Sequence, residues 1–226
     1  MPIEHRLAQS AYLEALGALV EGVVGLDDSD MLATSRCYGW NVGDVLVHVH
    51  LGLQEMVLAL GVWTDEEPDT DAAAYWRAFP PSPEITPAQI DDIQFVRRTN
   101  AAYRRPADLP RHFAVTAAGL ADRVTALPEV VTPFQGKIMA SGDFLAIWAV
   151  ELVIHHLDLQ AELAITSPSA AALLLARQTI EALIGGPLPS HLDDETVVLA
   201  GAGRVPLDQA QVRAAGSLAA RLPVLG

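Results

Sequence analysis

Apolar residues recur at helical spacing along the N-terminal part of the chain. The first run covers residues 5 to 25, where apolar side chains lie three or four positions apart until Gly25 closes the run. These side chains are Leu7, Tyr12, Leu13, Leu16, Leu19, Val20 and Val23. The spacing predicts an amphipathic first helix.

A second helix is predicted from about Val42 to Leu60. Asn41 is a suitable N-cap, and Asp44 occupies the third helical position, where the helix dipole favours an acidic side chain. The helix is apolar but carries His48 and His50. Two residues apart on a helix means about 200° of rotation, so the two histidines face opposite sides and cannot enter one site. We interpret His50 as a partly exposed histidine.

The rest of the chain is divided by turn signals. The pattern predicts a short helical piece at 72–78, helices at 87–103 and 107–127, an extended segment at 130–139, and a helix that begins near residue 143. After residue 166 it predicts a helix that begins with Pro168 and ends at Gly185, a strand at 196–200, and a last helix capped by Asp208. Tyr75 and Trp76 are expected to cap the core.

These elements define a fold class and a division of the chain. The fold class is mostly α, with a helical bundle over residues 1–166 and a small α+β subdomain over residues 167–226. A length of 226 residues suits one domain with such an appendage.

One apolar helix contains a polar seam. In WAVELVIHHLDLQAEL the residues Glu151, His155, Asp158 and Glu162 are spaced i, i+4, i+7 and i+11, so they share one face. A carboxylate buried there is costly unless a cation or hydrogen-bond donors satisfy it. Glu151 and His155 are spaced so that both can bind one metal ion, or they form a hydrogen-bonded pair without a metal.

Composition and charge exclude several partners. Charged residues give a net charge of −14, which repels nucleic acid and anionic membranes. No segment approaches the ~20 uninterrupted apolar residues of a membrane span, and no signal peptide is evident, so a cytoplasmic protein is expected. The single cysteine, Cys37, cannot form an intrachain disulfide, and we interpret it as a small buried residue.

Two motifs together resemble a known family. CYGWNVGDVLVH, residues 37–48, and ELVIHHLD, residues 151–158, are similar to the mycothiol-dependent maleylpyruvate isomerase family, whose metal-binding domain is related to the DinB-like four-helix bundles. The resemblance covers roughly residues 5 to 166. It implies one divalent metal held by His48, Glu151 and His155, with zinc first and nickel, iron or manganese also compatible with such ligands.

The resemblance also implies a reaction and its partners. A low-molecular-weight thiol such as mycothiol would be the cosubstrate and a small electrophile the substrate, for cis-trans isomerisation or for thiol transfer. Asp158 would accept a hydrogen bond from the N–H of a metal-binding side chain without touching the metal itself, or it is a solvated or capping carboxylate. Outside the region of resemblance, Arg204 follows the predicted strand, and its forked donors suit a carboxylate of the thiol or substrate, or it is an ordinary surface arginine. The alternative function is a non-catalytic metal-binding or interaction protein that retains the bundle and the site.

Overall fold

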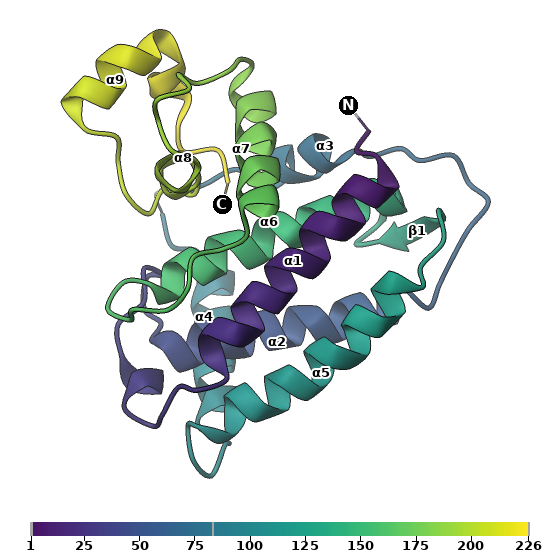
Figure 1. Cartoon of the computed structure of the whole chain (residues 1–226), viewed down its shortest axis with the longest axis vertical. Helices are drawn as coiled ribbons and strands as arrows, with labels where there is room; N and C mark the ends of the chain where they lie inside the picture. Colours follow the sequence, from purple (N-terminus) through teal and green to yellow (C-terminus); the bar gives the residue numbers. More distant parts are fainter. Residues whose placement is uncertain (1, 83, 226) are drawn as a thin grey trace.

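Four long helices form the body of the protein. The computed structural model describes residues 2–82 and 84–225. Helices α1 (His5–Val23), α2 (Val42–Ala59), α5 (Asp108–Thr125) and α6 (Ser141–Leu159) pack in a closed ring, so that α1 contacts α5 and α6, and α2 contacts the same two helices from the other side (Figure 1). The predicted helical bundle is therefore confirmed.

Shorter elements surround the bundle. They are η1 (Asp30–Leu32), α3 (Ala72–Arg77), α4 (Pro87–Asn100), β1 (Val131–Phe134), β2 (Lys137–Ala140), α7 (Ala170–Ile184), α8 (Asp194–Gly201), α9 (Gln209–Ala215) and η2 (Gly216–Arg221). The predicted extended segment is an antiparallel hairpin in which Phe134 pairs with Lys137. Its turn residues Gln135 and Gly136 have φ values of 48° and 74°, the two positive values that a two-residue type I′ turn requires.

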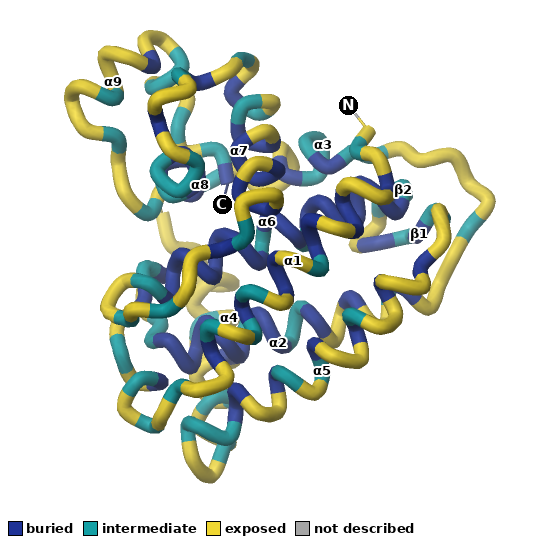
Figure 2. Tube along the Cα trace, in the orientation of Figure 1, coloured by how far each residue is buried: buried dark blue, intermediate teal, exposed yellow. Residues whose placement is uncertain are grey.

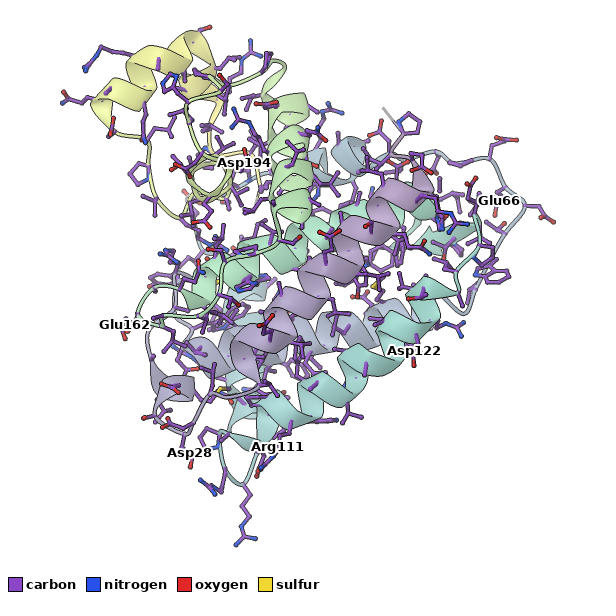
Figure 3. All side chains as sticks on the ribbon, viewed as in Figure 1. Asp28, Glu66, Arg111, Asp122, Glu162 and Asp194 are labelled. Carbon is purple, nitrogen blue, oxygen red and sulfur yellow. The ribbon has the colours of Figure 1, made fainter. Side chains whose placement is uncertain are left out.

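Helix α6 lies at the centre of the structure. All of its residues are buried except Trp148 and Glu151 (Figure 2). In Figure 3 the labelled side chains of Asp28, Glu66, Asp122 and Glu162 lie at the periphery. One of them, Glu162, was predicted to continue the polar seam of α6. That prediction is wrong, because α6 ends at Leu159 and Glu162 instead accepts a hydrogen bond of 3.0 Å from the backbone N–H of Thr34.

The start of α2 is fixed as the sequence predicts. Asn41 accepts a hydrogen bond of 2.8 Å from the backbone N–H of Asp44, and the Asp44 side chain accepts one of 3.2 Å from the backbone N–H of Asn41. Asn100 on α4 donates to Asp44 at 2.8 Å. This capping box satisfies backbone donors that the first turn leaves unpaired, and it holds in register the helix that carries His48.

The C-terminal part differs from the prediction. Residues 196–200, predicted as a strand, belong to α8, so the described part of this segment is helical and not α+β. Residues 196–200 have no partner strand in the part of the chain that the structure describes. Asp193 caps a helix there by accepting hydrogen bonds from the backbone and side chain of Thr196. The last helix is capped by Asp208 as predicted. Helix α7 begins two residues later than expected, with Ser169 as its cap.

Helix α2 also has the length and hydropathy of a membrane span. Over its 18 residues the mean hydropathy is 1.2, and 56% of the residues are buried inside the bundle. The core helix of a bundle meets the same criterion, so this is weak evidence for a membrane segment.

We expect Asn41→Ala to lower the free energy of unfolding by about 1 kcal/mol, because the capping hydrogen bond to α2 is lost. Asn41→Ser, which restores a capping oxygen, should retain most of the stability. Chemical denaturation followed by circular dichroism measures both. Equal stability of the two variants would contradict a capping role.

Candidate metal centre and its cavity

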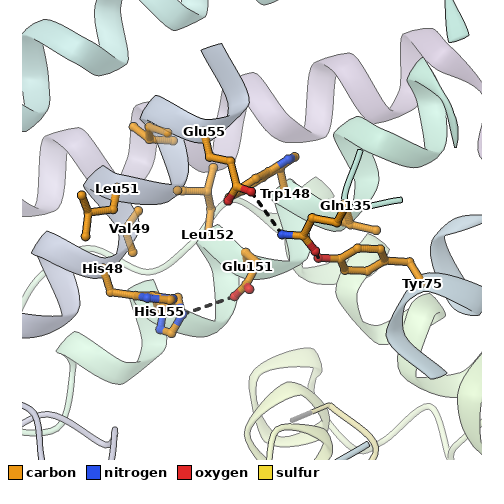
Figure 4. A pocket seen from close by; sticks show the side chains of 13 residues that line it. His48, Val49, Leu51, Glu55, Tyr75, Gln135, Trp148, Glu151, Leu152 and His155 are labelled. Atoms are coloured by element: carbon orange, nitrogen blue, oxygen red, sulfur yellow. Dashed lines mark hydrogen bonds and ion pairs between the residues drawn. The ribbon is translucent and has the colours of Figure 1, made fainter. Parts of the chain in front are cut away.

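Side chains from two helices converge beside the centre of α6. His48 of α2 and Glu151 and His155 of α6 each place one ligand atom within 4.8 Å of the others (Figure 4). His155 Nε2 lies 3.2 Å from Glu151 Oε2, and the rings of His48 and His155 are 4.8 Å apart and nearly perpendicular. Two imidazoles and a carboxylate are a ligand set that leaves a metal with an open position. The residues thus fit a divalent metal.

His155 is oriented from its other side by Asp158. Its Nδ1 lies 3.0 Å from Asp158 Oδ2, and Asp158 is fully buried. An ionised carboxylate only accepts hydrogen bonds, so Nδ1 carries the proton and Nε2 faces Glu151 and His48. Outer carboxylates hold metal-binding histidines in this way. Asp158 is therefore neither solvated nor a helix cap.

Arg204 contacts Asp158 and does not line the cavity. Its Nε donates to Asp158 Oδ1 at 2.9 Å, and its Nη2 donates to Oδ2 at 3.3 Å. Burial by itself would raise the pKa of Asp158, but the hydrogen bond from His155 and the charge of Arg204 outweigh burial and lower the pKa to about 2. Asp158 is thus an anion at neutral pH.

The two histidines differ in charge state. Burial and the neighbouring charge of His155 lower the pKa of His48 to about 4, so His48 is neutral at pH 7. Burial would also lower the pKa of His155, but hydrogen bonds to Asp158, Cys37 and Glu151 hold that pKa well above its usual value. The metal-free cluster therefore keeps one positive charge between its carboxylates. A bound metal would replace that charge.

Cys37 lies closer to the site than its sequence position suggested. It is buried as predicted, but its Sγ donates to Asp158 Oδ2 at 2.9 Å and lies 3.8 Å from His155 Nδ1. Cys37, His155 and Asp158 thereby form a second group with the spacing of metal ligands. Arg204 Nη2 lies 3.5 Å from the sulfur, and its positive charge disfavours a cation there. The group that contains His48 is the stronger candidate.

His50 is not the partly exposed residue that the sequence predicted. It is buried, and its Nε2 lies 2.8 Å from Thr116 Oγ1 of α5. His156, next to His155, turns away in the same manner, with its Nε2 2.6 Å from the carbonyl oxygen of Thr166. Each of the two candidate histidine ligands thus has a neighbouring histidine that bonds elsewhere in the bundle, and His50 and His48 face opposite sides as expected.

A cavity of about 250 Å³ opens beside the three candidate ligands. Its opposite wall contains Glu55 of α2, Tyr75 of α3 and Gln135 of the hairpin turn, and Trp148 of α6 lies beside Glu55 and Gln135 (Figure 4). Sequence reasoning missed these residues and expected Tyr75 only to cap the core. A polar side chain at a turn, or a lone tyrosine in an irregular segment, carries no spacing signal.

Comparison with known proteins identifies the family of this chain. Residues 12–160 match the family of the mycothiol maleylpyruvate isomerase N-terminal domain. The chain belongs to this family. The matched region contains the whole of α2 and α6 and therefore all three candidate ligands and Asp158, whereas Arg204 lies outside it.

Two solved structures are similar to this chain over most of its length. They are the mycothiol-dependent maleylpyruvate isomerase and a His-to-Ala mutant of it, each with a TM-score of 0.49 and 17% sequence identity. Each alignment covers 89% of this chain and 87% of the other. No curated protein gives a significant match.

We expect purified protein to hold about one divalent metal per chain, as a mononuclear site with an open position does, and His48→Ala, Glu151→Ala and His155→Ala to lose it. Elemental analysis measures the metal content.

The matched controls His50→Gln and His156→Gln should retain the metal, because these histidines bond to Thr116 and Thr166 instead. Cys37→Ser should retain it too. Loss in Cys37→Ser together with retention in His48→Ala would assign the metal to the other group.

We expect Asp158→Asn to weaken metal affinity by about 10–100-fold, because the charged acceptor that orients His155 is lost. Competition with a chelator of known affinity measures this change. Asp143→Asn is the matched control, since Asp143 is another buried aspartate of α6 but accepts hydrogen bonds from the backbone N–H groups of Ile3 and Ala72. An equal loss of affinity in both variants would show a general effect on the fold.

Proposed function

We propose that this protein is a metal-dependent enzyme that uses a low-molecular-weight thiol, such as mycothiol, to act on a small electrophile. The observation that carries the proposal is the meeting of His48, Glu151 and His155 on one wall of a cavity, in a chain of the maleylpyruvate isomerase family. Zinc is the preferred metal, because a His₂Glu set with an open position is typical of catalytic zinc. Iron, nickel and manganese accept the same ligands.

The residues of the chain would prepare the site for a thiol. A bound dication lowers the pKa of a coordinated thiol, so that the nucleophilic thiolate is available at neutral pH. Asp158 fixes the tautomer of His155, and Arg204 holds Asp158 in place. Apolar side chains of α2 and α6 line the cavity and reduce its water content, which strengthens electrostatic effects inside. Cys37 is buried against Asp158, so the nucleophile is supplied from outside the chain.

The reaction that fits is isomerisation by reversible thiol addition. The thiol sulfur bonds to one carbon of a cis double bond conjugated to a carbonyl, and the π electrons move toward that carbonyl. The resulting single bond rotates, and expulsion of the same thiol restores the double bond in the trans form. No atom or electron is gained or lost. Thiol transfer would stop once the thiolate has bonded to one carbon and a proton to the other, so that one thiol has been added overall, and product analysis separates the two reactions.

We expect mycothiol to change the visible and near-ultraviolet spectrum of the cobalt-substituted protein, because a thiolate ligand adds a charge-transfer band. An S-methylated thiol, which has no thiolate, is the control and should not produce the band. His155→Ala should lose both the metal and any thiol-dependent turnover. Tight metal binding with an unchanged spectrum would favour the non-catalytic metal-binding protein.

A further inference from the structure

Three polar side chains from separate elements join along the cavity wall that faces the candidate ligands. Tyr75 donates from its hydroxyl to Gln135 Oε1 at 3.0 Å, and Gln135 Nε2 donates to Glu55 Oε1 at 3.3 Å (Figure 4). A carboxylate only accepts, so the amide nitrogen must face Glu55 and the amide oxygen must face Tyr75. We call Glu55, Tyr75 and Gln135 the polar wall.

The backbone sets the position of Gln135, which lies with Glu55 at the exposed edge of the cavity. Gln135 occupies the first position of the hairpin turn with φ 48°, a left-handed conformation that suits Asn or Gly better than Gln. A residue held there at some cost in strain points to a role for its side chain. Gly52, one turn after His48, allows Trp148 to lie against α2, because a Cβ at Gly52 would be 2.8 Å from Cζ3 of that ring.

The charges around the cavity are unevenly distributed. Among the described residues that line it, Glu55 and Glu151 carry negative charge, and none is Lys or Arg. Arg204 is committed elsewhere, with Nε and Nη2 on Asp158 and Nη1 on the carbonyl oxygen of Ala202. If a dication and a thiolate were bound, the two positive charges of the metal would be cancelled by the negative charges of the thiolate and Glu151. The charges of Asp158 and Arg204 cancel each other. The charge of Glu55 remains.

We propose, on the basis of the function proposed above, that the cavity selects an uncharged electrophile and rejects one that carries two carboxylates. Glu55 repels a carboxylate and accepts a hydrogen bond from a hydroxyl or amide N–H of the substrate. The substrate class is therefore an uncharged α,β-unsaturated carbonyl compound. Maleylpyruvate, the compound in the family's name, carries two carboxylates and belongs to the class that the polar wall disfavours.

The first test compares dimethyl maleate, which is uncharged, with maleate, which has the same carbon skeleton and two negative charges. Rates with the zinc-loaded protein and mycothiol are divided by the uncatalysed rate of each compound with the same thiol. We expect this normalised rate to be at least about tenfold higher for dimethyl maleate, given the strength of charge repulsion at short range. A higher normalised rate for maleate would overturn the proposal.

Variants assign the selectivity to the polar wall. Glu55→Gln should shift the ratio of the two normalised rates about tenfold toward maleate, because it removes the repelling charge and keeps the shape. Glu21→Gln removes the same charge from the exposed end of α1 and should leave the ratio unchanged. If Glu55→Gln altered only the affinity for mycothiol, the wall would belong to the thiol and the proposal would fail.

A binding measurement separates selectivity from turnover. Trp148 lines the cavity, so a change in its fluorescence reports that a ligand has bound there. The variant Trp148→Phe shows how much of the total tryptophan fluorescence change comes from Trp148. The saturated and unreactive pair dimethyl succinate and succinate is titrated into zinc-loaded protein with mycothiol. We expect dimethyl succinate to bind at least about tenfold more tightly. Equal or tighter binding of succinate would overturn the inference. If the protein bound dimethyl succinate selectively but converted neither maleate nor dimethyl maleate, the proposed function would be refuted and the selectivity of the cavity would stand.

Discussion

The site depends on one fully buried carboxylate. Asp158 has no exposed surface, and such a charge is tolerated only when donors surround it. The donors come from three parts of the chain: Cys37 before α2, His155 on α6, and Arg204 after α8. Removing any one of them would leave part of the charge unpaired. The carboxylate therefore joins the bundle to the C-terminal helices at the position where His155 must be held.

The same constraint explains where the cavity lies. Helix α6 is buried on nearly every side, and the two residues that escape burial, Trp148 and Glu151, both line the cavity. Glu151 is one turn before His155, so fixing His155 through Asp158 also fixes the direction of Glu151. On the facing helix, the absence of a side chain at Gly52 leaves room for Trp148. Ligand geometry and cavity shape therefore follow from the packing of α2 on α6.

The sequence predicted the helices of the bundle, and the resemblance to the family named three candidate ligands that the structure brings together. The three candidate ligands lie on regular helices, where i, i+4 spacing and opposed histidine faces translate directly into position. The role of Cys37 was not predictable, because its contact with Asp158 joins residues 121 positions apart. The polar wall was missed for the same reason. The strand expected at 196–200 shows that a β-branched run yields to a strong cap when no partner strand exists.

The candidate ligands and most of the polar wall lie in different kinds of structural element, and this difference bears on substrate specificity. The candidate ligands belong to the bundle helices α2 and α6, whereas two members of the polar wall, Tyr75 and Gln135, belong to a short helix and a hairpin turn between them in the chain. Connecting segments of this kind vary more readily than packed helices, because few buried contacts constrain them. Under the proposed function, the metal site would stay the same while the charge of the accepted substrate changed with the wall. Membership of the family establishes the bundle, and under the proposed function the side chains opposite the candidate ligands would decide which electrophile enters.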